Sequence, residues 1–388
     1  MLAEMTIDDL IGNEQAFPIL KHRTFLNHAA VAPITAPAAE ALRRYADQAQ
    51  TDVYIGTGWY RGVEACRSTV ARLINATSDE VALVKNTGEG ISIVARGLDW
   101  QAGDRIITTA VEYPANIYPW MDLQQTHGVE LVMIPETHQP DGSVLVSDDA
   151  IIAAIDHPRT RMVALSHVQY ASGQRMDVAR IGRRCRERGV LFCVDAIQSI
   201  GVLPVDVQSM SIDFLSADGH KWMLGPEGAG VFYIRKALLE RVRPLSVGWM
   251  NVINAQDYGN YDFTLRPDAR RYECGSWNIP GFLALGASLE LLASVGIDVI
   301  FDRVRRLGDR LIAGLRRRGW RVISPRSEIA TSAAVAFDST RFAMQQVYES
   351  LRAQRIEVAL REGRLRASPH FYNTDEQIDR LIDALPAH

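Results

Sequence analysis

Hydrophobic residues along the chain gather in short apolar runs, and amphipathic stretches separate these runs. Most of the runs stay apolar throughout and lack the alternation of a half-exposed strand. Such runs are typical of strands that are covered on both faces, as in parallel sheets. The strands predicted in this way lie at residues 81–86, 105–110, 130–135, 161–168, 190–196, 213–222 and 228–236.

The amphipathic stretches between these runs predict helices. Residues 40–50, 60–74 and 178–189 show helical periodicity, and the last stretch ends in a glycine, which favours a helix C-terminus. Strands that alternate with helices form mainly parallel sheets with helices on both faces. The expected fold class is therefore α/β.

The pattern changes towards the C-terminus. Residues 247–280 are rich in Gly, Asn, Tyr and Trp and predict long ordered loops, and helices are expected at 281–295 and 300–318. The remainder predicts a smaller α+β unit. We expect an N-terminal arm at residues 1–23 that packs with the small domain, a large domain at 24–281 and a small domain at 282–388.

Charge and composition exclude several classes of partner. The 388 residues carry a formal net charge of -4, which provides no basic surface for nucleic acid. No apolar run approaches the roughly 18 residues of a membrane span. The N-terminal segment is acidic where a signal peptide would be basic and then apolar. We therefore expect a cytoplasmic protein without a nucleic-acid or membrane partner.

Metal binding and several phosphate sites are also excluded by the sequence. The cysteines Cys66, Cys185, Cys193 and Cys274 lack the spacing of metal ligands, and the histidines include no HExxH pair. The chain contains no Walker phosphate loop and no dinucleotide fingerprint between a strand and a helix. We expect reduced thiols and no metal.

Polar residues follow two of the predicted strands. Asp195 lies at the end of one run, Gln198 follows it after three residues, and Lys221 lies at the end of a later run. Ligand groups of α/β sheets lie at the carboxyl ends of strands. A carboxylate and a lysine there form either a plain ion pair or part of a binding site, and the residue types alone leave both open.

The segments VDAIQSIG and SADGHKWMLGPEG resemble the lysine segment of fold-type I enzymes that use pyridoxal 5'-phosphate (PLP). The likeness is greatest to the class V aminotransferase family, which includes cysteine desulfurases, selenocysteine lyases and isopenicillin N epimerases, and it covers residues 24–385. The resemblance implies a large domain with a mainly parallel seven-stranded sheet between helices, and a small α+β C-terminal domain. It also implies PLP as the cofactor and an amino acid as the substrate.

The family motif assigns roles to four residues of these segments. Lys221 is implied to form a Schiff base with PLP and then to move protons at the substrate Cα. Asp195 is implied to pair with the pyridine nitrogen, Gln198 to hydrogen-bond the 3-oxygen, and His220 to bind the phosphate.

A turn after the first predicted strand fits a phosphate site. Asn86 and Glu89 have the spacing of a capping box at a helix N-terminus. Free amide groups at such an end bind phosphate readily. The resemblance implies that Thr87 and Gly88 hold the PLP phosphate.

Aromatic and amide residues follow two further strands. Tyr113 matches the family residue that stacks on the PLP ring and is assigned with the catalytic groups, although cysteine desulfurases have a histidine there. Gln169 and Tyr170 match a strand end near the cofactor and the substrate, Gln169 as a cofactor ligand and Tyr170 as a substrate ligand. Which of the two points inward stays open, because neighbouring strand residues face opposite sides.

The remaining assignments also come from the resemblance. Arg366 is implied to bind the substrate α-carboxylate with its planar charged fork, whereas Arg361 and Arg364 are expected in solvent. Asn27 and His28 are implied to line the substrate pocket. Ser276 is implied to reach the phosphate bound by a second subunit, which predicts a homodimer with shared active sites.

Several reactions remain open. Desulfurases need a cysteine on a mobile loop shortly before the substrate arginine, and residues 355–366 are short and lack cysteine. We expect a PLP-dependent aminotransferase that acts through an external aldimine and a Cα carbanion. A C–S lyase performing β-elimination and an epimerase are the alternatives. A persulfide-forming desulfurase is disfavoured, and a non-catalytic PLP-binding regulator is disfavoured most.

Overall fold

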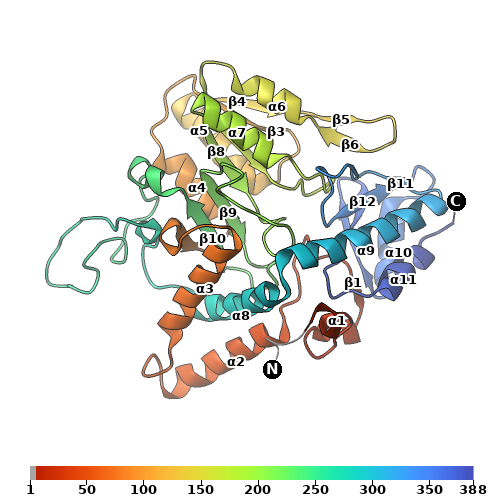
Figure 1. The fold of residues 1–388 in the computed structure, drawn as a ribbon, viewed down its shortest axis with the longest axis horizontal. Helices are drawn as coiled ribbons and strands as arrows, with labels where there is room; N and C mark the ends of the chain where they lie inside the picture. Colours follow the sequence, from red (N-terminus) through yellow and green to blue (C-terminus); the bar gives the residue numbers. More distant parts are fainter. Residues whose placement is uncertain (1–5, 388) are drawn as a thin grey trace.

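A seven-stranded sheet lies at the centre of the larger lobe (Figure 1). This computed structural model describes residues 6–387. The strand order is β2 (Val81–Val84), β10 (Gly230–Ile234), β9 (Phe214–Asp218), β8 (Leu191–Asp195), β7 (Thr160–Ser166), β3 (Arg105–Thr109) and β4 (Glu130–Ile134). β10 runs antiparallel to both of its neighbours, and the other neighbouring pairs are parallel. The predicted mainly parallel seven-stranded sheet is confirmed.

Each predicted strand of the large sheet is present, with ends that shift by a few residues. The largest change is in the run 213–222, where the strand β9 ends at Asp218. A turn follows, and Gly219 in this turn lies so close to Ala229 that an added Cβ would approach its carbonyl oxygen to 2.7 Å. The strand ends where the apolar residues of the run are followed by the polar residues Asp218, His220 and Lys221.

Helices cover both faces of this sheet, and strand side chains alternate between two apolar cores. Val81 and Leu83 of β2 belong to one core, and Ala82 and Val84 belong to the other. The first core is covered by α3 (Trp59–Leu73), α6 (Asp148–Ile155), α7 (Val178–Arg188) and α8 (Ile279–Val295). The second core is covered by α4 (Thr87–Gly97) and α5 (Tyr118–His127), while α2 (Ala36–Thr51) packs on α8.

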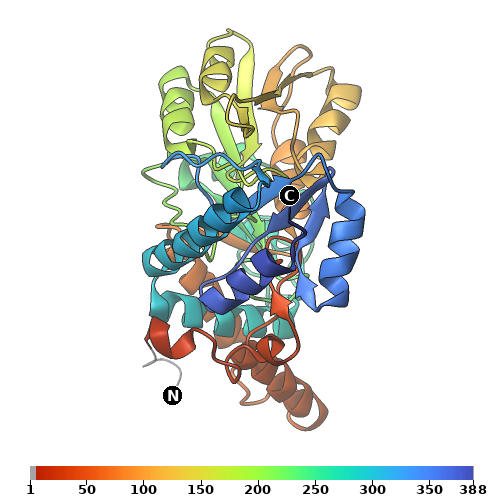
Figure 2. The same cartoon turned by 90° about the vertical axis from the view of Figure 1, so that its right-hand side faces the viewer.

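The smaller lobe contains a four-stranded antiparallel sheet (Figure 2, blue). Its order is β11 (Arg321–Val322), β12 (Val335–Asp338), β15 (Arg364–Ala367) and β14 (Ala359–Arg361). The helices α9 (Ile297–Arg317), α10 (Met344–Ala353) and α11 (Asp375–Ala384) pack on it around a separate core. The α+β character expected for this part of the chain is confirmed.

The N-terminal segment contacts the smaller lobe. β1 (Thr24–Phe25) pairs with β13 (Ile356–Glu357), and the ring of Phe17 stacks on Tyr372 with 3.9 Å between centroids. A helix α1 (Ile7–Leu10) precedes these contacts, and residues 1–5 of the predicted arm lie outside the described part. The three predicted domain limits stay a prediction, and Leu285 of α8, beyond the limit at 281, is buried in the core of the large sheet.

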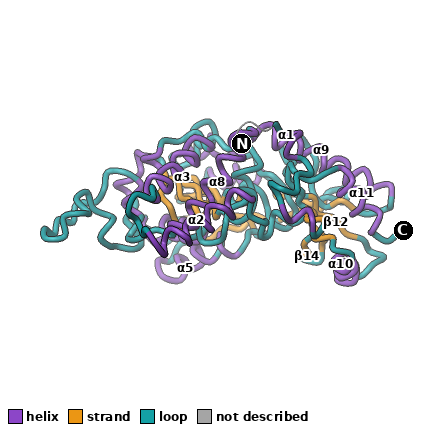
Figure 3. Tube along the Cα trace, turned by 90° about the horizontal axis from the view of Figure 1, so that it is seen from below, coloured by secondary structure: helices purple, strands orange, loops and turns teal. Residues whose placement is uncertain are grey.

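Two further features complete the fold. A hairpin joins β5 (Glu136–His138) to β6 (Val144–Val146), and residues 245–266 form a loop that projects from the body (Figures 1 and 3). Within the described residues no single helix is long and apolar enough to cross a bilayer. Only α8 and α9 taken together meet the conditions of length and composition, and they are bent by 81°.

Candidate active site

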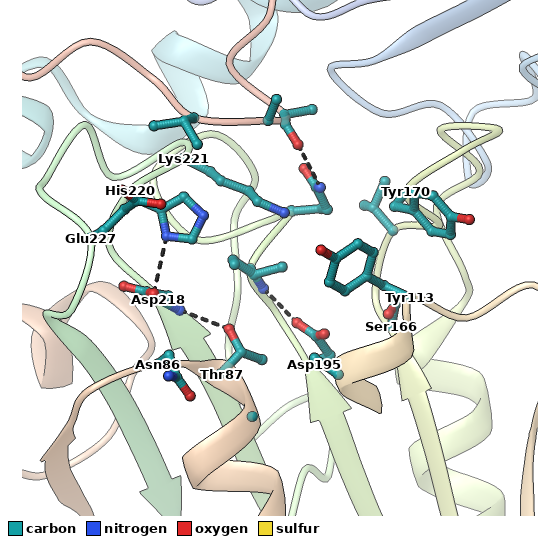
Figure 4. Close-up of a pocket in the computed structure, with 18 of the residues that line it drawn as sticks. Asn86, Thr87, Tyr113, Ser166, Tyr170, Asp195, Asp218, His220, Lys221 and Glu227 are labelled. Carbon is teal, nitrogen blue, oxygen red and sulfur yellow. Dashed lines mark hydrogen bonds and ion pairs between the residues drawn. The ribbon is translucent and has the colours of Figure 1, made fainter. Parts of the chain in front are cut away.

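A cavity of about 430 Å³ opens at the carboxyl ends of β7, β8 and β9 (Figure 4). Segments from both lobes meet around it, because the hairpin of β14 and β15 faces the edge of the large sheet. The residues that line it are Ala29, Ala30, Val31, Asn86, Thr87, Gly88, Tyr113, Ala115, Ser166, Val168, Tyr170, Asp195, Ile197, Gln198, Asp218, His220, Lys221, Glu227, Arg361 and Arg366. The cavity therefore gathers most of the residues predicted from the motifs.

The side chain of Lys221 extends from the turn after β9 into the cavity (Figure 4). Only 9% of the residue is exposed. Burial lowers the pKa of the Lys221 amine, the positive charge of Arg366 lowers it further, and the carboxylate of Asp195 opposes this shift. The neutral amine, which is the form that attacks an aldehyde or accepts a proton, is thus more accessible than in a free lysine.

Asp195 ends β8 and presents its carboxylate to the same cavity. Its Oδ1 accepts a hydrogen bond of 2.9 Å from the backbone N–H of Ile197. Burial raises the pKa of the Asp195 carboxyl, and the nearby carboxylate of Glu112 adds to the shift. A buried carboxylate of this kind favours a cationic partner, which the pyridinium nitrogen of PLP would provide.

The N-terminus of α4 forms one end of the cavity. Asn86 caps the helix by accepting a 2.9 Å hydrogen bond from the N–H of Glu89, as predicted. The Glu89 carboxylate accepts from the N–H of Lys85 at 2.6 Å, one residue earlier than in a capping box. The first amides of the helix have no intrahelical acceptor, so the amides of Thr87 and Gly88 are placed to bind an anion.

Side chains extend this anion site. Thr87 Oγ1 accepts a 3.0 Å hydrogen bond from the N–H of Asp218, which leaves the Thr87 hydroxyl proton for donation. His220 Nδ1 lies 3.1 Å from Oδ2 of Asp218 and both residues line the cavity. An N–H group of the His220 ring would donate a hydrogen bond to a phosphate at this helix end.

Tyr113 and Tyr170 form an aromatic wall. Their rings meet edge to face with 5.4 Å between centroids, and Lys221 Nζ lies 5.6 Å from the Tyr113 ring centroid. The Tyr170 hydroxyl donates a 3.1 Å hydrogen bond to Glu362 on the hairpin of the smaller lobe. Tyr170 is therefore the residue of the Gln169–Tyr170 pair that faces the cavity.

Gln169 lies beneath the cavity lining and donates from Nε2 to Oε1 of Glu112 at 2.9 Å. Sequence reasoning gave no role to Glu112, although the residue directly precedes Tyr113. Its buried carboxylate also accepts hydrogen bonds from Thr109, Asn116 and the backbone and side chain of Ser166. Glu112 thus ties the end of β3, which carries Tyr113, to the end of β7, which carries Tyr170. An acidic residue three positions after the end of a buried strand was the available signal.

The guanidinium group of Arg366 is buried and only partly paired. Nη1 donates to the backbone oxygen of Tyr170, whereas Nε and Nη2 are buried without a hydrogen-bond partner among the described residues. Burial lowers the pKa of Arg366, and repulsion from Arg361 contributes. An unpaired buried cation that lines a cavity calls for an anionic ligand, as a substrate α-carboxylate would be.

Two arginines near Arg366 differ from the expectation that both lie in solvent. Arg361 is half-buried and lines the cavity. Arg364 donates a 2.9 Å hydrogen bond to Oε1 of Glu136 and pairs with that carboxylate. The prediction was wrong because the tight hairpin holds both side chains on the face that meets the larger lobe.

Other predicted ligands take different positions. Gln198 lines the cavity, but its Oε1 accepts from Trp222 and its Nε2 donates to Ala29, which leaves one N–H for a ligand. His28 is fully buried outside the cavity lining, and its ring nitrogens lie 2.8 Å from Ser368 O and 2.6 Å from Tyr372 Oη. From this position the His28 ring packs behind the cavity lining, and its implied contact with the substrate stays a prediction.

Asn27 and Ser276 also stay outside the cavity lining. Asn27 is half-buried and its Oδ1 has no hydrogen-bond partner among the described residues. Ser276 is exposed on the loop after η6 (Ala269–Tyr272). Both assigned roles stay predictions.

The residues of the cavity fit PLP. The helix end at Thr87 and Gly88 suits a phosphate, and the Tyr113 ring lies beside Lys221. The carboxylate of the buried Asp195 forms no ion pair with any residue that the structure describes. Among the described residues no group of three or more His, Cys, Asp or Glu side chains is arranged to hold a metal ion. The donor set is thus that of an aldehyde cofactor with a phosphate group.

Known proteins resemble the chain along nearly its whole length. A probable cysteine desulfurase of Methanothermobacter thermautotrophicus is 30% identical over 391 residues and is covered to 95%, as is this chain. The apo structure of a cysteine desulfurase from Thermococcus onnurineus NA1 has 25% identity and a TM-score of 0.87, covering 99% of this chain and 98% of that chain. A complex of the cystine C–S lyase C-DES with its product cysteine persulfide has 26% identity and a TM-score of 0.84, covering 95% and 98%.

The family model described as aminotransferase class-V matches residues 24–381. This range includes the large sheet, the cavity and the hairpin that carries Arg366. The chain therefore belongs to the class V aminotransferase family of PLP-dependent enzymes.

Proposed function

We propose that this enzyme transfers the amino group of an α-amino acid by moving a proton at the substrate Cα. The observation that supports the proposal is the convergence of Lys221, Asp195 and Arg366 on one cavity from separate segments of the chain. Bound PLP supplies an electron sink that stabilises negative charge at Cα. The protein then has to hold the cofactor, orient the amino acid and move the proton.

Each of the three residues has one of these tasks. Arg366 binds the α-carboxylate through its unpaired Nε and Nη2, which places Cα within the cavity. The Lys221 amine takes the proton from Cα, and its lowered pKa favours this exchange near neutral pH. The Asp195 carboxylate stabilises positive charge on the pyridine nitrogen.

β-Elimination of a cysteine-type substrate is the second candidate. Its support is the structural likeness to the cystine C–S lyase C-DES. The same proton removal would initiate both reactions, and the group at Cβ would decide between them.

A persulfide relay through the hairpin is disfavoured. The turn between β14 and β15 contains Glu362 and Gly363 and no cysteine. Cys66, Cys185 and Cys193 are buried, and the exposed Cys274 does not line the cavity. The chain thus lacks the thiol that the desulfurase reaction requires at this place.

An absorption titration of the PLP-loaded enzyme separates these reactions. Amino acids are added one at a time, including alanine, cysteine and cystine. Lasting loss of the visible PLP band, which a keto acid reverses, is the expected result. Spontaneous return of the band with accumulation of pyruvate and a sulfur product would instead establish the lyase. A band that no amino acid perturbs would contradict the proposed function.

We also infer that the enzyme works as a homodimer. Ser276, the predicted ligand of a second subunit's cofactor, is exposed and stays outside this chain's own cavity. The projecting loop next to it exposes Tyr258, Tyr261 and Phe263, side chains that favour a protein contact. Light scattering is expected to give twice the chain mass, and a monomeric mass in the active enzyme would contradict the inference.

A further inference from the structure

The hairpin of β14 and β15 points two arginines at the cavity. In its register Arg366 lies opposite Ala359, and Arg361 lies two residues beyond Ala359 on the same strand. Because strand side chains alternate, Arg361 and Arg366 share one face of the hairpin. Leu365 on the opposite face is buried in the core of the smaller lobe. Both guanidinium groups are therefore directed towards the substrate end of the cavity.

Arg361 has no carboxylate partner among the described residues. Its one hydrogen bond in the structure runs from Nη1 to the backbone oxygen of the adjacent Leu360, at 2.9 Å. Arg364, its cross-strand neighbour on the same face, is neutralised by Glu136. Of these two neighbouring arginines, Arg364 is paired with a carboxylate, whereas the positive charge of Arg361 is not paired by any described residue.

Positive charge accumulates at this end of the cavity. Arg361 lowers the pKa of both Arg366 and Lys221 through repulsion. Asp195, Asp218 and Glu227 also line the cavity, but none of them forms an ion pair with Arg361 among the described residues, and the adjacent Glu362 accepts from the Tyr170 hydroxyl. A single substrate carboxylate held by Arg366 would leave Arg361 without a counter-charge.

The backbone of Arg361 is fixed before any ligand binds. Glu362 and Gly363 form a two-residue turn with φ values of 48° and 74°, a left-handed pair that is typical of tight hairpins. The Glu362 carboxylate accepts the hydrogen bond from Tyr170, which ties the hairpin to the larger lobe. Little backbone freedom is lost when an anion binds, so the backbone of the site is preorganised.

We propose that Arg361 selects α-amino acids with an acidic side chain, such as a carboxylate or a sulfinate. Arg366 binds the α-carboxylate, and Arg361 binds the second acidic group with its own planar fork. The proposal rests on the proposed function, because it assumes that Arg366 receives the α-carboxylate. It narrows the substrate class from amino acids in general to acidic amino acids.

Matched pairs of substrates test the selection. Aspartate is compared with asparagine, glutamate with glutamine, and cysteine sulfinate with cysteine, on the loaded enzyme. We expect the acidic member of a pair to have the higher kcat/KM. Arg361→Gln is expected to lower kcat/KM about 10- to 100-fold more for the acidic member than for the neutral member, the effect of one lost charge-assisted interaction. Arg364→Gln, a matched change on the same face, is expected to preserve the preference.

Binding of unreactive anions gives a second readout that does not depend on turnover. Calorimetry with the PLP-loaded enzyme compares succinate with propionate, and Arg361→Gln is measured in parallel. We expect succinate to bind about 10-fold more tightly than propionate, and Arg361→Gln to remove the difference. Arg366→Gln is expected to weaken both anions.

The outcomes separate the two proposals. An equal loss for acidic and neutral substrates in Arg361→Gln would show that both arginines hold one carboxylate and would overturn the selection. Equal affinities for succinate and propionate would also overturn it. Tight succinate binding that requires Arg361, in an enzyme that converts no amino acid, would retain the anion site and reject the proposed function.

Discussion

Replacing Lys221 with alanine is expected to abolish the covalent attachment of PLP and to lower turnover by about 10³-fold or more. The side chain is the amine that lines the cavity between Tyr113 and Asp195, and 9% of the residue is exposed. Loss of a positioned acid–base group alone costs about 10²- to 10⁴-fold in rate. The variant also loses the nucleophile that captures the aldehyde.

The measurement is borohydride reduction followed by peptide mass analysis. The wild-type enzyme is expected to carry the reduced cofactor on the peptide with Lys221, and Lys221→Ala to carry none. Lys236→Ala removes an exposed lysine far from the cavity lining and serves as the control. Covalent cofactor that persists at another lysine in Lys221→Ala would contradict the assignment.

Chemical rescue adds a check on the role of the amine. Methylamine is expected to restore part of the turnover in Lys221→Ala, because it fits the space left by the removed side chain and supplies a neutral base. The rescue should grow with pH, since the fraction of neutral amine rises towards its pKa. A fold defect would not respond to the added amine, so rescue distinguishes a missing base from a disturbed structure.

The strands of the large sheet were predictable because a strand buried on both faces consists of apolar residues along nearly its whole length. The run from Leu191 to Asp195 is apolar until its last residue, and every one of its side chains is buried. Such a run needs no knowledge of its neighbours to be recognised. The strand order, by contrast, depends on contacts between distant segments. Local sequence patterns carry no signal that β10 lies beside β2.

Short strands of the smaller lobe were less predictable. β1 and β13 contain two residues each and pair across more than three hundred positions of sequence. β14 and β15 are joined by Glu362 and Gly363, and a non-glycine residue with positive φ gives a weak local signal for such a tight turn. Pairing between distant short segments is fixed by the packing of the whole lobe.

Motif residues at the ends of strands lie where the sequence predicts them, whereas residues assigned from segments without a strand end are less well placed. Asp195 and Lys221 line one cavity as expected from the ends of β8 and β9. His28 was assigned from its segment, yet it is the neighbouring Ala29 that reaches the cavity while the histidine ring packs on Tyr372. Arg361 was expected in solvent, whereas its half-buried side chain lines the cavity. Only the pairing of the hairpin reveals which face it occupies.

Replacing Asp195 with asparagine is expected to lower kcat by about 10²- to 10³-fold, the cost of removing one preorganised electrostatic group. The change keeps the shape and the acceptor for the Ile197 N–H, but it removes the charge that holds a proton on the pyridine nitrogen. PLP affinity should fall about 10-fold or more, as for one charge-assisted hydrogen bond, while the covalent bond to Lys221 persists.

The control for Asp195→Asn is Asp47→Asn, which makes the same charge change at an exposed position of α2. Kinetics and cofactor titration are measured for both variants. A cofactor analogue whose pyridine nitrogen carries a permanent positive charge is expected to restore much of the lost rate in Asp195→Asn, because that analogue no longer needs the carboxylate to stay cationic. Wild-type kcat in Asp195→Asn would contradict the assignment. Equal losses of kcat in both variants would show that the net charge of the protein causes the effect. Rescue of kcat by the analogue in Asp195→Asn alone would show that the buried carboxylate at the end of β8 causes it.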